Sequence, residues 1–226
     1  MLRVGGVHRR RLAALLATVL VVLVPAPTAS YAASDGEVSA KLRAAVKKLP
    51  VAPETRRGYD RDKFRHWTDA DGDCQDTRDE VLRAESLVAT SGCDITEGKW
   101  RSYYDGVTTE DPSDFDIDHL VPLAEAWDSG AKRWTKKTRE RFANDLGDRR
   151  SLVAVSASAN RSKSDRDPAE WMPDRGQCKY VRQWVAVKLR WRLTVNRPER
   201  TFLVDRAASC DNLVITVRRA KVRTKS

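Results

Sequence analysis

Histidine is scarce in this chain of 226 residues, which contains only three. The scarcity limits where side-chain acid–base chemistry near neutral pH can occur. His8 lies in the N-terminal segment discussed next. His66 lies among aromatic residues in Phe64-Arg65-His66-Trp67, with no other histidine near it, and we interpret it as structural. By elimination, His119 is the candidate for a proton carrier.

Long apolar runs are also lacking, apart from Leu12 to Val24 near the N-terminus. At about 13 residues this run is shorter than the ~20 that a membrane span needs. Four arginines precede it, and the small-residue sequence Ser30-Tyr31-Ala32 follows it. This order is typical of a secretory signal peptide, with cleavage expected near Ala32. We therefore expect a leader at residues 1–32 and a secreted protein with no stable membrane association.

Acidic residues are too few to balance the basic ones, because the formal charge is +10. Without residues 1–32 it falls to about +6 over roughly 194 residues. This excess suits a polyanionic partner such as nucleic acid or a cell-wall polymer. Repeats, low-complexity blocks and strong linkers are absent. We expect one monomeric domain at residues 33–215, followed by a disordered basic tail at residues 216–226.

Close Cys-x-x-Cys spacing is absent, and no histidine adjoins a cysteine, which argues against a zinc site. The four cysteines all lie in the exported part of the chain, where an even number usually means disulfides. Three connectivities are possible. We favour Cys74–Cys93 and Cys178–Cys210, because each pair brackets an expected helix.

Hydrophobic periodicity predicts a mostly helical α+β domain. Helices are expected at residues 38–49, 77–88, 124–128, 135–146, 178–193 and 198–208, with another short one opening at Asp167-Pro168. Strands are expected at residues 100–104, 115–121 and 151–155. Ser34 to Glu37 and Thr77 to Glu80 resemble capping boxes.

Two polar stretches, Asp116 to Pro122 and Ala159 to Asp165, carry the chemistry. The first ends a strand, and the second lies on a loop entering a helix just after another strand, which is a ββα arrangement. Hydrolysis of a phosphodiester needs a base to activate water, positive charge near the phosphoryl oxygens and help for the leaving oxygen. The two stretches offer each of these.

Within these stretches, Asp118 and Asn160 supply the hard oxygen ligands that suit Mg²⁺, Mn²⁺ or Ca²⁺. An unligated His119 can accept the proton of a water molecule. Lys163 and Arg161 could steady the phosphate, and arginine would do so through two hydrogen bonds.

The motif Asp-x-Asp-His-Leu-Val-Pro, followed by Leu-Val-Ala-Val-Ser-x-x-x-Asn-Arg-Ser-Lys-Ser-Asp-x-x-Pro, resembles the ββα-metal, or HNH, endonucleases. It is similar to the HNH domain of RNA-guided CRISPR nucleases. Over residues 56–210 the chain is also similar to a family of secreted bacterial HNH-type proteins, which share motifs such as Phe-x-His-Trp and Pro-x-x-Trp. The resemblance implies a ββα-metal core inside the helical domain.

The same resemblance implies that Asp118 is a metal ligand, His119 the general base and Asn160 the second metal ligand. One position departs from the family pattern. The middle asparagine, whose usual role is to orient the base, is replaced by Ser151 or its neighbours Arg149 and Arg150. The resemblance therefore does not identify the partner of His119.

Strand geometry leaves one ligand open, because consecutive strand residues point to opposite faces. Asp118 and His119 share a site only if the strand twists or bulges there, which we favour. Otherwise Asp116 is the ligand. Two residues of the second expected helix, Arg78 and Glu80, either project toward the site or only cap their own helix.

The segment Asp69-Ala70-Asp71-Gly72-Asp73, with Glu80 at the twelfth position, suggests a calcium loop. The sixth position of such a loop needs glycine for its turn and is occupied by Cys74, which favours a plain acidic turn. Taken together, the sequence predicts a secreted, metal-dependent HNH-type endonuclease that hydrolyses DNA, or RNA, with low sequence specificity. The alternative is a secreted basic protein that binds nucleic acid or cell wall without turnover.

Overall fold

The computed structural model describes residues 1–2 and 36–225. Residues 3–35, which contain most of the expected leader and the first two residues of the first expected capping box, lie outside the described residues. Within the described part, no helix combines the length and the apolar character needed to cross a membrane.

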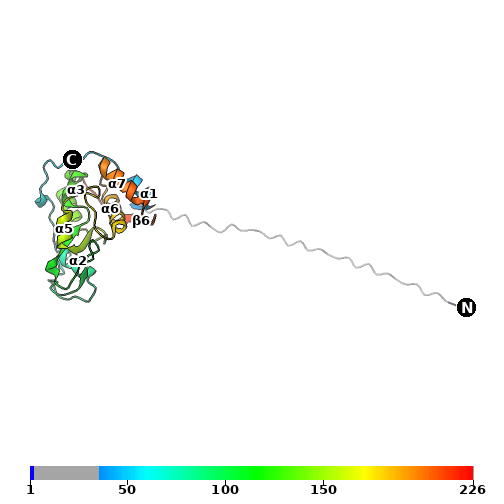
Figure 1. The fold of residues 1–226 in the computed structure, drawn as a ribbon, viewed down its shortest axis with the longest axis horizontal. Coiled ribbons are helices and arrows are strands. Elements are labelled where there is room, and N and C mark those ends of the chain that lie inside the picture. Colours follow the sequence, from blue (N-terminus) through cyan, green and yellow to red (C-terminus); the bar gives the residue numbers. More distant parts are fainter. Residues whose placement is uncertain (3–35, 226) are drawn as a thin grey trace. The chain divides into compact units, whose positions relative to one another are not determined.

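Three two-stranded antiparallel sheets organise the described chain. The pairs are β1 (Glu37–Lys41) with β6 (Val214–Arg218), β2 (Trp100–Arg101) with β3 (Thr108–Thr109), and β4 (Phe115–His119) with β5 (Leu152–Ser156). The helices are α1 (Leu42–Lys48), α2 (Thr77–Glu85), α3 (Leu123–Asp128), α4 (Lys136–Ala143), α5 (Ala157–Lys163), α6 (Gln177–Trp191) and α7 (Arg197–Ala208) (Figure 1). Short 3₁₀ turns are η1 (Arg61–Lys63), η2 (Pro112–Asp114) and η3 (Ala131–Arg133). The expected mixed α and β composition is confirmed.

The sheet formed by β1 and β6 joins the two ends of the described domain. Residues expected to open a helix at position 38 form β1 instead, and the helix begins only at Leu42. The strand is stabilised by a distant partner, since Ala40 pairs with Ile215 and the hydroxyl groups of Ser39 and Thr216 hydrogen bond at 2.9 Å. The helix expectation was wrong for these residues because they pair with a strand 177 residues away, which a local sequence pattern does not reveal.

The basic segment at residues 216–226 also differs from the disordered tail that the sequence suggested. Its first residues belong to β6, which ends at Arg218. Beyond the strand, Ala220 N donates to Arg190 O, and Thr224 forms a β-bridge with Trp134. These main-chain bonds hold the segment against α6 and the residues before α4.

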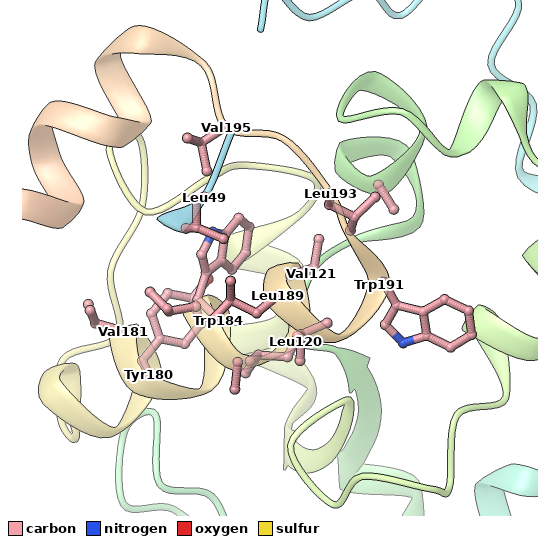
Figure 2. Packing of buried hydrophobic residues seen from close by; sticks show 14 of the residues in the cluster. Leu49, Leu120, Val121, Tyr180, Val181, Trp184, Leu189, Trp191, Leu193 and Val195 are labelled. Atoms are coloured by element: carbon pink, nitrogen blue, oxygen red, sulfur yellow. The ribbon is translucent and has the colours of Figure 1, made fainter. Parts of the chain in front are cut away.

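The larger hydrophobic cluster is built around α6. Tyr180, Val181, Trp184 and Leu189 project from this helix into the packing shown in Figure 2. Leu120 and Val121, which directly follow β4, are buried in the same cluster. Burial of such side chains contributes roughly 1.5–3 kcal/mol each. The end of β4, and with it His119, is therefore fixed by core packing.

A second cluster packs α2 against one face of the β4–β5 pair. Phe115 and Ile117 of β4 contribute to it, together with residues of α2 such as Leu82. Since side chains alternate along a strand, Asp116 and Asp118 point to the other face. The alternation of apolar and acidic residues in β4 thus separates the packing from the chemistry.

Both expected disulfides, Cys74–Cys93 and Cys178–Cys210, are formed. Two local expectations differ from the structure. The N-cap of α2 is Asp76, which accepts from the backbone N–H groups of Arg78 and Asp79, so the capping box does not begin at Thr77.

The second local difference is the segment that begins at Asp167, which makes a single turn instead of a helix. The Asp167 carboxylate accepts from Ala169 N as an N-cap would, and Asp167 O accepts from Trp171 N. Pro173 disfavours a helical conformation of the residue before it, which stops the turn from continuing.

Candidate active site

The β4–β5 pair supplies the rigid base of the candidate site. Its register runs without interruption from Phe115 opposite Ser156 to His119 opposite Leu152, so no bulge occurs at Asp118. Ser156 then caps α5 by accepting from Ala159 N. This cap starts the helix that carries Asn160, Arg161 and Lys163, and α5 contacts both strands.

A cavity of about 420 Å³ brings four of the predicted site residues together: Asp118, His119, Asn160 and Arg161. His119 reaches it although the strand does not bulge, because it is the last residue of β4 and the chain turns directly afterwards. Tyr59, Arg61 and Asp165 complete much of the wall. Asp116 does not line this cavity.

Asp118 is buried and accepts hydrogen bonds from two neighbours. Lys163 Nζ donates to both of its carboxylate oxygens at 2.7 Å, and the Tyr104 hydroxyl donates to Oδ2 at 2.6 Å. Burial raises the pKa of Asp118 and lowers the pKa of Lys163, and their mutual attraction opposes both shifts. Asp118 is thus held on the cavity wall by a lysine and a tyrosine.

Lys163 does not lie where the sequence suggested, beside a substrate phosphate. Its side chain is completely buried, and its ammonium also donates to His119 O at 3.0 Å. The cationic group that faces the cavity from α5 is instead the exposed guanidinium of Arg161. Lys163 therefore acts on the end of β4 and not on the cavity itself.

The amide of Asn160 is oriented by Asp116. Asn160 Nδ2 donates to Asp116 Oδ2 at 3.0 Å, and Arg161 Nε lies 3.9 Å from the same oxygen. Within the described residues, no hydrogen bond engages the Asn160 amide oxygen. Asp116 fixes the donor side of the amide, which leaves the carbonyl oxygen available.

His119 is held by a main-chain carbonyl. Its Nε2 donates to Ala143 O at 2.8 Å, and its ring stacks on Trp67 with the centroids 5.4 Å apart. Because a carbonyl only accepts, Nε2 carries the proton, and Nδ1 of the neutral ring has a free electron pair. Burial lowers the pKa of His119 to about 3; the Ala143 bond opposes this shift and the charge of Arg61 adds to it. The ring is therefore neutral at physiological pH.

The second histidine lies closer to His119 than the sequence indicated. His66 meets its ring edge to face at a centroid distance of 6.2 Å, and its Nδ1 donates to Phe64 O at 2.8 Å. It does not line the cavity. Its contacts are those of a residue that packs the wall behind His119.

Arg78 and Glu80 of α2 lie outside the cavity. The Arg78 guanidinium donates to Pro112 O and Phe115 O, each at 3.0 Å, and so ties the segment before β4 to α2. Glu80 lines a smaller hollow between α2 and the residues before β5. Neither side chain lines the cavity that holds the other predicted site residues.

The acidic loop gathers three exposed aspartates, Asp69, Asp71 and Asp73, whose oxygens lie within 4.8 Å of one another. Glu80 is not part of this group. The Asp69 carboxylate is already bonded to the backbone N–H groups of Gly72 and Cys74. The loop is organised by its own hydrogen bonds, as an acidic turn would be.

Sequence reasoning missed several parts of the site, namely Tyr104, Trp67, Tyr59, Arg61 and the carbonyl of Ala143. Trp67 had a signal, because it belongs to the Phe-x-His-Trp motif. The Ala143 carbonyl had none, since any residue presents the same main-chain group. It is nevertheless the group that bonds His119, the partner that the motif comparison left open.

Comparison with known proteins relates the chain to endonucleases. Residues 75–206 match the family model described as GmrSD restriction endonucleases, C-terminal domain, and the chain belongs to this family. The matched segment contains β4, β5 and α5. The chain is also 38% identical over 202 residues to an uncharacterized secreted protein of Arthroderma benhamiae, a match that covers 87% of this chain and 97% of the relative. No solved structure matches.

The predicted secretion is confirmed. The relative is described as secreted, and the chain forms two disulfides, which persist in oxidising compartments. The relative is a fungal protein. The resemblance to bacterial secreted proteins and to the CRISPR nuclease domain therefore stays a prediction.

Proposed function

We propose that this protein is a secreted, divalent-metal-dependent endonuclease of the HNH type that hydrolyses DNA with little sequence preference, RNA being the alternative substrate. The observation that supports it best is one cavity that holds a carboxylate, a neutral imidazole and an oriented amide: Asp118, His119 and Asn160. The succession of β4, β5 and α5 has the order that a ββα-metal core requires. Membership of an endonuclease family supports the same reaction class.

The residues present fit a divalent cation. Asp118 Oδ1 accepts only from Lys163, so it retains a lone pair, and the Asn160 amide oxygen is unbonded within the described residues. Both are the hard oxygen donors that Mg²⁺, Mn²⁺ and Ca²⁺ prefer. Two protein ligands are enough for Mg²⁺, which usually keeps several water molecules and binds substrate phosphate. Asp116, the alternative ligand, would instead orient Asn160.

In the proposed reaction, His119 Nδ1 accepts the proton of the attacking water. The Ala143 carbonyl fixes the tautomer that leaves this nitrogen free. Arg61 and Arg161 line the cavity and would neutralise the phosphate, while Lys163 positions Asp118. A bound cation would supply Lewis-acid stabilisation of the charge that develops on the phosphoryl and leaving oxygens.

The test is plasmid nicking by the chain without its leader, with Mg²⁺ or Mn²⁺ and with a chelator, and with RNA assayed in parallel. His119→Ala should lower the metal-dependent rate about 10²–10⁴-fold, the usual contribution of a general base. His66→Ala is the matched control and should retain most of the activity, because His66 does not line the cavity.

Two results would contradict the proposal. Absence of metal-dependent cleavage of DNA and RNA by the wild-type protein would refute the enzyme and favour the secreted basic binding protein. If His119→Ala cut as fast as wild type, the assigned base would be wrong.

A further inference from the structure

A second hollow, of about 930 Å³, is lined in part by α4, the helix whose last residue, Ala143, bonds His119. Its walls come from residues 65–70, α4, the turn at residues 144–147, the end of α6 and residues 218–221. The last of these walls belongs to the basic segment that follows β6. The proposed reaction does not use this groove, which shares no lining residue with the cavity.

The groove is strongly basic. Seven cationic side chains and three carboxylates line it. Two of the carboxylates are already paired with groove arginines: Asp145 with Arg190 at 2.7 Å and Glu140 with Arg65 at 3.7 Å. The third, Asp69, is bonded to main-chain N–H groups. The carboxylates therefore leave most of the positive charge uncompensated.

Five cationic side chains of the groove have no carboxylate partner among residues 36–225: Lys137, Arg141, Arg218, Arg219 and Lys221. One of them also has an unused buried donor. The Nε of Arg141 is shielded from solvent and has no hydrogen-bond partner, although its guanidinium donates to Lys221 O. A buried donor without an acceptor is costly, so this guanidinium gains a hydrogen bond if it turns its Nε toward an anion in the groove.

The groove and the catalytic cavity share structural elements. The outer residues of α4 line the groove, while its last residue, Ala143, holds His119. One continuous segment lines both hollows, because Tyr59 and Arg61 face the cavity and Arg65 and Thr68 face the groove. A nucleic-acid strand bound at the cavity can therefore continue along this segment to the groove.

We propose that this groove binds the phosphate backbone of nucleic acid, at positions away from the bond that is cleaved. The identity of the polyanion rests on the proposed function, whereas the groove and its charge do not. Contacts from lysine and arginine to phosphates give affinity without sequence information. Such a surface suits a nuclease with little sequence preference, since it holds a chain of any sequence.

The test measures binding without turnover, in the His119→Ala background and with a chelator present. Lys137→Gln, Arg219→Gln and Lys221→Gln are introduced together; all three side chains are exposed, so the fold should tolerate them. The probe is a fluorescent DNA oligonucleotide long enough to span both hollows. Affinity at moderate salt should fall about 10–10²-fold, and the slope of log affinity against log salt should become shallower by about 2–3.

The matched control removes the same charge elsewhere, by Lys41→Gln, Lys47→Gln and Lys48→Gln. These residues are exposed and line neither hollow. Equal binding by the groove and control variants would overturn the inference and leave the proposed function standing. Loss of binding to an acidic polysaccharide but not to DNA would also overturn it. Groove-dependent DNA binding by a protein that never cleaves would uphold the groove and refute the proposed function.

Discussion

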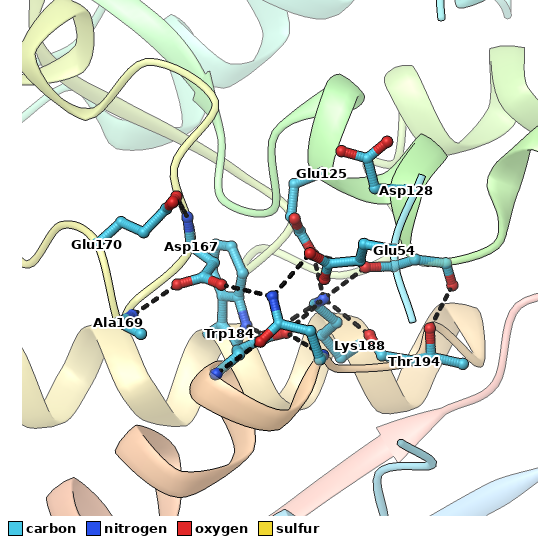
Figure 3. Close-up of polar contacts among 12 residues, drawn as sticks. Glu54, Glu125, Asp128, Asp167, Ala169, Glu170, Trp184, Lys188 and Thr194 are labelled. Atoms are coloured by element: carbon cyan, nitrogen blue, oxygen red, sulfur yellow. Dashed lines mark hydrogen bonds and ion pairs between the residues drawn. The ribbon is translucent and has the colours of Figure 1, made fainter. Parts of the chain in front are cut away.

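Two lysines of this protein, Lys163 and Lys188, are both completely buried, yet their surroundings differ. Lys163 faces one carboxylate, Asp118, at the edge of the candidate-site cavity. Lys188 pairs with two carboxylates, those of Glu125 and Glu199; Figure 3 shows its contact with Glu125. Burial opposes the charge of both, but the two glutamates outweigh it and raise the pKa of Lys188, whereas the pKa of Lys163 is lowered. The number of facing carboxylates decides how firmly each lysine keeps its proton.

The two lysines also connect different parts of the fold. Lys188 of α6 joins α3, through Glu125, to α7, through Glu199, and also donates to Ser129 and Thr194. It lies in the middle of the carboxylates, as Figure 3 shows. Lys163 joins only α5 to the end of β4. We therefore assign the Lys188 cluster to stability and the Lys163 pair to the site.

The largest expected effect is that of Lys188→Met on stability. The substitution leaves two buried carboxylates without their cation, which should lower the free energy of unfolding by about 3–5 kcal/mol. Guanidinium denaturation measures it. Activity per folded molecule, measured below the unfolding transition, should stay near wild type. Adding Glu199→Gln should recover part of the loss, and a change below about 1 kcal/mol would contradict the structural role.

Lys163→Met should lower stability less than Lys188→Met does, and activity more. The loss of stability should be smaller, about 2–3 kcal/mol, because Asp118 already has a raised pKa and can take up a proton when its partner is lost. The cleavage rate should fall at least about tenfold, because Asp118 loses the bond that positions it. Both are measured on one preparation, by denaturation and by plasmid nicking. Unchanged nicking by Lys163→Met would remove the distinction between the two lysines.

The sequence predicted the parts of the site that lie close together along the chain. The strands expected at residues 115–121 and 151–155 are formed as β4 and β5, although β4 ends earlier, at His119. The same reasoning failed for β1, whose residues fit a helical period but pair with a strand at the other end of the chain. Local patterns contain no signal for such a partner, and tertiary pairing overrides helix propensity.

The site residues show the same limit. The scarcity of histidine pointed to His119, and the resemblance to HNH endonucleases implied Asp118 and Asn160; the three do meet at one cavity. The sequence could not reveal that Lys163 is buried beneath Asp118, because a lysine in a polar run is usually exposed. Nor could it reveal the Ala143 carbonyl that bonds His119. Asp116 and Asp118 share one face of β4, so strand alternation could not choose between them. The packed structure distinguishes them, because Asp118 lines the cavity and Asp116 does not.

The smallest expected effect concerns pH and the edge of the Lys188 cluster. Burial, followed by the charge of Glu125, raises the pKa of Glu54 to about 7. In the unfolded chain this carboxyl has the ordinary glutamate pKa of 4.5, so the folded state binds more protons between pH 4.5 and 7. The stability contributed by protonated Glu54 is therefore lost as the pH rises through about 7. His119, whose pKa is lowered, acts oppositely and costs stability as the pH falls below about 6.5.

Glu54→Gln separates these two contributions, because the amide keeps an acceptor for Asn196 and cannot ionise. The variant should match wild type below pH 5 and exceed it at pH 8 by about 1 kcal/mol, a value reduced for the half-exposed position of Glu54. Thermal unfolding at both pH values measures it, with Glu97→Gln, at an exposed position outside the cluster, as the control. If the variant gained no stability at pH 8, the ionised carboxylates around Lys188 would not destabilise the folded state. The excess of negative charge in the Lys188 cluster would then no longer distinguish this cluster from the Lys163 pair, which has one carboxylate for one lysine.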